Sequence, residues 1–131
     1  MFKKILLPVD LAEPEMARQA TDRGVALAKA SGAALRFVTV QPTVPVVAEY
    51  QHLASQDEID AFVAAIDYPK ELVSTVVRFG AAYHEVLIEA EEWGADLILL
   101  SSHRPSMSTY LLGSNAAKIV RHAACSVLVL R

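Results

Sequence analysis

The chain has 131 residues, of which 53% are hydrophobic, and a formal net charge of −3 at pH 7. This length is typical of one domain with a single core, here residues 1–131, and the composition argues against disorder. The negative charge gives no electrostatic footprint for nucleic acid and opposes binding to an anionic membrane. The first apolar run is too short for a signal peptide, and no run is long enough to span a membrane. We therefore expect a cytoplasmic protein with neither nucleic acid nor membrane as a partner.

The first forty residues predict a strand, a helix and a second strand. Residues 5–9 form a continuous apolar run, as expected for a strand that is buried on both faces. Pro14, flanked by two acids, is typical of a helix start, and Gly32 is typical of a helix end. Residues 35–40 are rich in Phe, Val and Thr and predict the second strand.

The next segment combines helix-breaking and helix-starting signals. Residues 42–54 contain two prolines, so we expect an irregular connection there. Ser55 and Glu58 have the spacing of a capping box, which predicts that a helix begins at Ser55. Apolar residues follow at i, i+3, i+4 and i+7, and we expect Pro69 to stop this helix.

The rest of the chain continues the alternation of strands and helices. The patterns predict strands at 72–79, 97–100 and 127–130, separated by helices at 83–93 and 114–122. Such alternation indicates an α/β fold: an open, doubly wound, Rossmann-like parallel sheet of five strands with helices on both faces.

Ligands of such sheets bind outside the carboxyl ends of the strands. This rule selects the residues that follow each strand: Pro8, Val9, Asp10, Thr39, Val40, Gln41, Gly80, Ala81, Ser101, Ser102, His103, Arg104, Gly113, Ser114 and Asn115.

Each of the stronger candidates has a ligand-binding and a purely structural interpretation. Gly113, Ser114 and Asn115 open the last helix, where free N–H groups favour an anion, although Ser and Asn are also ordinary caps. Arg104 is suited to clamp phosphates, or it is a solvated loop residue. Asp10 is suited to bond hydroxyls or amines, or it caps the first helix, and the two roles are compatible.

Catalytic and metal-binding signals are weak. The four histidines show no metal-ligand spacing, and the single cysteine, Cys125, is better explained as a small buried apolar residue than as a reactive thiol. His103 is placed to touch a ligand only by its position after a strand. No phosphate-loop, dinucleotide or nucleophile-elbow motif is present. We expect no metal site and no catalytic residues.

Five segments form a recognisable set: Met1–Asp10, Gly94–Ile98, Ser102–Pro105, Thr109–Ala117 and Val120–Val129. Together they resemble the universal stress protein family over the whole length of the chain, and its short members of the F and G type most. The resemblance implies the strand order 3-2-1-4-5, a homodimer joined through the C-terminal strand, possible higher oligomers, and ATP as the ligand, with or without Mg²⁺.

The resemblance also implies roles for individual residues. Val9 and Val38 would flank the adenine and Asp10 would bond the adenosine part. The remaining contacts, to ribose and phosphates, would come from Ser101, Arg104, Gly113, Ser114 and Asn115.

One departure from the family pattern leaves two functions open. Nucleotide-binding members carry glycines where this chain has Ser101 and Arg104, and only eight residues separate Arg104 from Gly113. The favoured interpretation is a dimeric, ATP-binding stress-response protein with a regulatory or protective role. It would hydrolyse ATP very slowly at most, because no general base is evident at the phosphate end. The alternative is a nucleotide-free protein-interaction module whose pocket is blocked by Arg104 or filled by a small anion.

Overall fold

The computed structural model describes residues 1–43, 48–101 and 114–131, with the backbone alone for residues 48–54. Five strands form one parallel sheet in the order β3-β2-β1-β4-β5, which confirms the predicted fold class and strand order. The strands are β1 (Lys4–Pro8), β2 (Ala34–Gln41), β3 (Val73–Phe79), β4 (Leu97–Ser101) and β5 (Ser126–Leu130). β1 pairs with both β2 and β4, so the chain reverses its direction of sheet growth at β1.

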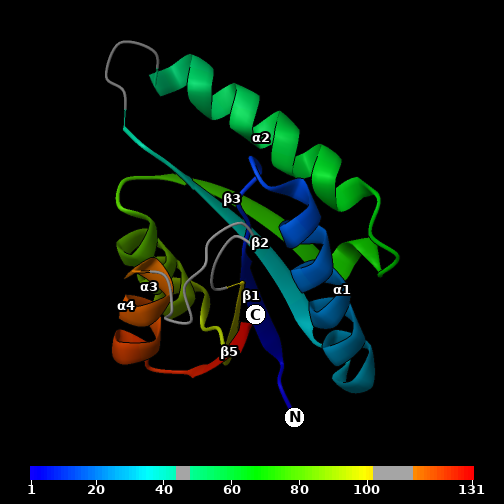
Figure 1. Cartoon of the computed structure of the whole chain (residues 1–131). Coiled ribbons are helices and arrows are strands. Elements are labelled where there is room, and N and C mark those ends of the chain that lie inside the picture. The colour runs from blue at the N-terminus through cyan, green and yellow to red at the C-terminus, as the bar shows by residue number, and fades with distance from the viewer. Residues whose placement is uncertain (44–47, 102–113) are drawn as a thin grey trace.

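Helices cover both faces of the sheet. In Figure 1, α1 and α2 lie together on one side of the strands, and α3 and α4 lie together on the other. Their bounds are α1 Pro14–Ser31, α2 Ala48–Ala64, α3 Ala82–Trp93 and α4 Ser114–His122, with a short 3₁₀ turn at Lys70–Leu72. Among the described residues, none of the helices has both the length and the apolar character needed to cross a bilayer.

Strand residues alternate between two apolar cores, as the period of a strand requires. Ile5 and Leu7 of β1 pack in the core beneath α1 and α2, whereas Leu6 packs in the core beneath α3 and α4. Gly24 allows α1 to approach β1 closely, because a β-carbon there would lie 2.7 Å from Leu7 Cδ2. Both faces of the central strand are therefore dry, which explains its uninterrupted apolar sequence.

The predicted start of the second helix is wrong. α2 begins at Ala48, inside the segment that we expected to be irregular, and Ser55 lies within it with only 6% of its surface exposed. Ser55 therefore occupies a buried helix position and does not cap a helix end. Good helix formers such as Ala, Glu, Gln and Leu dominate residues 48–54, so the prolines at 42 and 45 did not prevent a helix from starting soon after them. The helix also ends at Ala64, before Pro69.

The predicted ends of the first and third helices are confirmed. Gly32 and Gly94 adopt left-handed conformations, with φ of 68° and 79°, and end α1 and α3 as C-caps. Asp96, directly before β4, fixes the start of the sheet: its carboxylate accepts hydrogen bonds from the backbone N–H groups of Lys3 and Lys4 at 2.8 and 3.0 Å. These contacts align the start of β4 with the start of β1.

Candidate functional site

A cavity of about 630 Å³ opens at the carboxyl edge of the sheet, a volume within the usual range for small-molecule sites. Seven of the ten residues predicted from the sequence line it: Pro8, Val9, Asp10, Val38, Ser101, Ser114 and Asn115. The other three, His103, Arg104 and Gly113, lie outside the described residues. The cavity lies beside β1, where the direction of sheet growth reverses.

The ends of β1 and β2 form one wall of the cavity. The Val9 N–H donates to the Val38 carbonyl at 2.8 Å, so the backbone stays paired one residue beyond the strand. Asp10 is exposed, and its Oδ1 accepts a hydrogen bond from the Ala12 N–H at 2.9 Å. This is an Asx turn that leads the chain into α1. The other carboxylate oxygen has no hydrogen bond within the described part of the chain, so the turn does not prevent Asp10 from also contacting a ligand.

The starts of α3 and α4 form the opposite wall. Ala82, Ser114 and Asn115 belong to the first turns of these helices and line the cavity. Asn115 Oδ1 accepts a hydrogen bond from the Tyr83 N–H at 3.3 Å. The side chain of Asn115 thus joins the first turn of α4 to that of α3, instead of capping its own helix. Two helix N-termini therefore face one cavity, and each favours negative charge.

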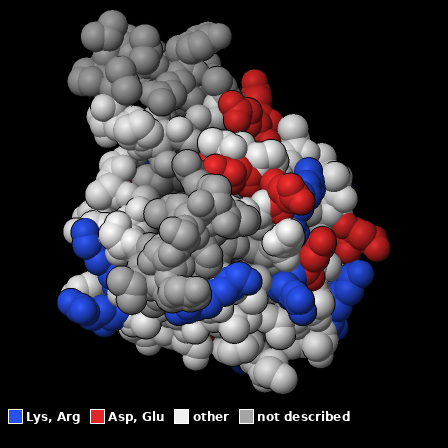
Figure 2. Space-filling view, viewed as in Figure 1, with Lys and Arg blue, Asp and Glu red and all other residues white. Residues whose placement is uncertain are grey.

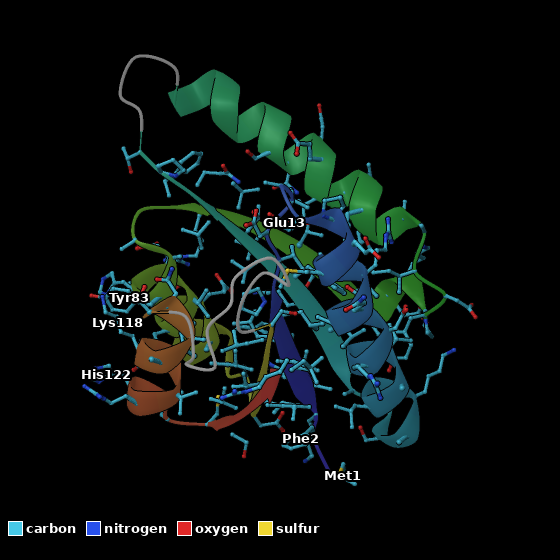
Figure 3. All side chains as sticks on the ribbon, viewed as in Figure 1. Met1, Phe2, Glu13, Tyr83, Lys118 and His122 are labelled. Carbon is cyan, nitrogen blue, oxygen red and sulfur yellow. The ribbon has the colours of Figure 1, made fainter. Side chains whose placement is uncertain are left out.

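Tyr83 also contacts α4 through its ring. Lys118 Nζ lies 4.4 Å from the ring centroid, a cation–π contact between the two helices. Figure 3 shows the two labelled side chains next to each other on the outer side of α3 and α4, above His122. The contact holds the helix starts together from outside the cavity.

The charges of the described cavity wall are acidic. Asp10 and Glu13 lie at the start of α1, and no Lys or Arg is found among the described lining residues. Figure 3 shows Glu13 at the beginning of α1, above the end of β1. In Figure 2, acidic side chains gather over the α1 and α2 side of this face, and basic side chains lie over the α4 side and below. Attraction for an anion in the described part of the site therefore comes from the starts of α3 and α4.

An ion-pair network fixes α3 over the sheet. Glu89 lies between two arginines of neighbouring strands: its Oε2 is 2.9 Å from Arg36 Nη1 and its Oε1 is 2.9 Å from Arg78 Nη1. Arg78 also pairs with Glu85 at 2.9 Å. Burial opposes the charge of Arg78, but its hydrogen bonds to Glu85 and Glu89 outweigh this and raise its pKa. The network holds α3 against β2 and β3.

Sequence reasoning missed part of the cavity. Met16, Ala17 and Ala20 of α1 line it, and none of them was predicted to belong to the site. Thr39 and Gln41 were selected by position but were given no role, and both contribute to the wall. The signal that was available for them is the polarity of two alternate residues at the end of a strand that is otherwise apolar on that face.

The described cavity wall contains neither a metal-binding cluster nor the cysteine. No cluster of three or more His, Cys, Asp or Glu side chains suited to a metal ion occurs in the described ranges. Cys125 is partly buried directly before β5, and burial raises the pKa of its thiol.

The open, doubly wound sheet and the cavity at its switch point define a class of α/β proteins that bind ligands at this edge. The sequence profile of the universal stress protein family matches residues 1–131. Universal stress protein G of Shigella flexneri is 33% identical over an alignment of 142 residues that covers all of both chains, and the same holds for universal stress protein G of Escherichia coli O157:H7. The chain therefore belongs to the universal stress protein family.

Solved structures agree with this assignment. UspA from Lactobacillus plantarum superimposes with a TM-score of 0.74 at 23% identity, over 98% of this chain and 97% of that one. A universal stress protein crystallised in complex with cAMP gives a TM-score of 0.65 at 25% identity, over 99% and 97% of the two chains. The first likeness concerns the fold alone, and the second also shows that a structural neighbour binds an adenine nucleotide.

Proposed function

We propose that this chain is a single-domain, cytoplasmic stress-response protein that binds ATP at the carboxyl edge of its sheet. The observation that carries the proposal is the cavity beside β1. It combines apolar lining residues, two helix N-termini and the carboxylate of Asp10, of which one oxygen has no hydrogen bond within the described part of the chain. Helix N-termini favour the negative charge of phosphates. Val9 and Val38, at the ends of β1 and β2, provide apolar surfaces against which a base would pack. The neighbour that binds cAMP supports an adenine nucleotide as the ligand class.

The cavity is large enough for the proposed ligand. Its volume of about 630 Å³ lies well within the range of sites for drug-sized molecules. Small residues such as Ala17, Ala20, Ala82 and Ala116 line it and leave its interior open. The acids at the start of α1 are better matched to hydroxyl and amino groups of a nucleoside than to its phosphates. The nucleoside therefore belongs near Asp10, and the phosphates near Ser114.

We further propose that the protein works as a homodimer joined through β5. This strand is at the edge of the sheet, and Leu128 on it keeps 37% of its surface exposed. An apolar edge strand presents unpaired backbone groups that a second strand satisfies. Nucleotide binding in such a dimer would act as a regulatory or protective signal.

The direct test is to identify what the purified protein carries. Acid extraction followed by chromatography should release ATP, and calorimetric titration of nucleotide-free protein should show binding of ATP. A protein that neither carries nor takes up any nucleotide would refute the proposal. It would favour the alternative, an interaction module of the same fold.

Asp10 provides a site-specific test. Asp10→Ala should weaken ATP binding by about ten-fold or more, since a hydrogen bond to a charged group contributes about 1.5–3 kcal/mol. Asp10→Asn is the matched control, because an amide oxygen still accepts from the Ala12 N–H and preserves the turn into α1. Asp10→Asn should bind ATP with intermediate affinity. Unchanged affinity in Asp10→Ala, at unchanged stability, would exclude Asp10 as a ligand contact.

A further inference from the structure

The hydroxyl proton of Thr39 has no acceptor among the described residues. Thr39 is only 2% exposed and lines the cavity. Its oxygen accepts a hydrogen bond from Gln41 Nε2 at 3.3 Å, but its own proton has no acceptor within the described part of the chain. Buried polar groups are almost always paired, so such an exception calls for a partner that enters the cavity.

A second buried threonine shows the usual arrangement. Thr21 is also 2% exposed, and its hydroxyl donates to the Ala17 carbonyl at 2.7 Å within α1. In a strand, backbone carbonyls are committed to the neighbouring strands, and the described residues offer Thr39 no equivalent acceptor. The difference between the two residues is therefore one of local structure, and only Thr39 lines the cavity at the carboxyl edge.

Gln41 completes a paired set of hydrogen-bonding groups. It lies two residues after Thr39, so both side chains are on the same face of β2. Gln41 lines the cavity, and because its Nε2 points to Thr39, its Oε1 is left as an acceptor without a partner in the described ranges. The wall thus presents a donor, the Thr39 hydroxyl, beside an acceptor, the Gln41 carbonyl oxygen.

This order of groups matches one class of base. A 6-aminopurine carries an amino donor beside a ring nitrogen that accepts, which is the complement of the Gln41 oxygen and the Thr39 hydroxyl. A 6-oxopurine carries an acceptor and a protonated ring nitrogen in these places, so it meets an oxygen with an oxygen and a donor with a donor. Sites built to hydrogen-bond one pattern discriminate against the analogue because buried groups are left unpaired.

We propose that Thr39 and Gln41 read the 6-position of the purine and make the site select adenine over guanine. The inference rests on the proposed function and adds to it two side chains that determine base specificity. Thr39 supplies the donor and keeps the amide of Gln41 oriented with its oxygen toward the ligand. Gln41 supplies the acceptor for the exocyclic amino group.

The test compares nucleotides that differ only in the base. Calorimetric titration of nucleotide-free protein with ATP, GTP and inosine triphosphate gives an ATP:GTP affinity ratio, from which the phosphate contribution cancels. Thr39→Val removes the hydroxyl at nearly constant shape and should lower this ratio about ten-fold, as expected for the loss of one or two hydrogen bonds. Gln41→Met should lower it similarly, and Thr39→Ser, which keeps the hydroxyl, should restore most of it.

Thr21→Val is the matched control. It removes a buried threonine hydroxyl outside the cavity, so it should lower the thermal midpoint but leave the ATP:GTP ratio as in the wild type. A ratio in Thr39→Val that equals the wild-type ratio would overturn the inference. Equal binding of ATP and GTP by the wild-type protein would also overturn the inference, because it would mean that the Gln41 amide rotates to suit either base. The proposed ATP binding would survive both of these results. A wild-type protein that binds no nucleotide would overturn both proposals together.

Discussion

Replacement of Glu89 by alanine is expected to loosen α3, which forms part of the cavity wall. Glu89 is 4% exposed and accepts hydrogen bonds at 2.9 Å from both Arg36 and Arg78. Glu89→Ala removes the one carboxylate that, among the described residues, pairs with arginines of both strands, and it leaves both guanidinium groups short of a partner. Arg78 keeps its bond to Glu85, whereas Arg36 keeps Ser74 and the face of Trp93.

The magnitude follows from burial. Breaking a fully buried ion pair by removing one partner costs about 3–5 kcal/mol. The side chains of Arg36 and Arg78 are 27% and 20% exposed, so water partly replaces the lost carboxylate. We therefore expect Glu89→Ala to lower the free energy of unfolding by about 2–3 kcal/mol. For a chain of this length that corresponds to a fall of roughly 6–12 °C in Tm.

Urea unfolding followed by circular dichroism measures this loss, and Glu92→Ala is the matched control. Glu92 is on the same helix and 3.6 Å from the same Arg78, but its side chain is 66% exposed. An exposed pair of this kind contributes about 0–1 kcal/mol. If Glu89→Ala and Glu92→Ala destabilise the protein equally, the reasoning from burial is refuted.

Three further predictions concern the edge strand, the thiol and a buried phenol. Leu128→Lys should convert the homodimer into a monomer, as measured by light scattering at micromolar concentration, because Lys protects an exposed strand edge from pairing. The control is Val120→Lys, at a 45% exposed site on α4, which should remain a dimer. A monomeric wild type would contradict the proposed dimer. Burial raises the pKa of Cys125, so the pH midpoint of its alkylation should lie above that of free cysteine, and a lower midpoint would contradict this. Burial also raises the pKa of Tyr68, whose hydroxyl donates to the Ala33 carbonyl at 2.6 Å. The stability linked to its protonated form is therefore present below the unfolded pKa, near 10, and is lost as pH rises through the higher folded pKa. The free energy of unfolding should fall between pH 9 and pH 11 by less in Tyr68→Phe than in the wild type. An equal fall in the two proteins would contradict this prediction.

The fold was predictable because its signals are local and repeated. The apolar sequence of β1, the glycines at 32 and 94, and the proline at 14 each set the type or end of an element without reference to the rest of the chain. The start of α2 was not predictable in this way. The capping-box pattern at Ser55 is a local signal, but tertiary packing buries that position inside a longer helix.

The site was predictable where topology alone decides it. The rule that ligands meet the carboxyl ends of strands was enough to bring Asp10, Ser101 and Ser114 to one cavity. It could not reveal that Asn115 bonds to the start of α3, because that contact joins helices 32 residues apart. Nor could it reveal that the hydroxyl proton of Thr39 has no partner in the described structure, since this depends on which acceptors surround it.

Arg104 decides between the ATP-binding protein and the blocked module. The described cavity wall has no Lys or Arg, and Arg104 is the only such residue in the sequence 102–113, so it is the natural source of a cation for the phosphates. If it clamps phosphate, Arg104→Ala should lower ATP affinity by about 2 kcal/mol, roughly thirty-fold, and adenosine affinity much less. Arg104→Lys should recover only part of this loss, because an ammonium group lacks the planar fork. If Arg104 instead plugs the pocket, Arg104→Gly should improve ATP binding. Replacement of Arg104 by a small residue therefore lowers ATP affinity if the arginine clamps phosphate and raises it if the arginine plugs the pocket. Tighter ATP binding in Arg104→Gly would overturn the assignment of Arg104 to the phosphates.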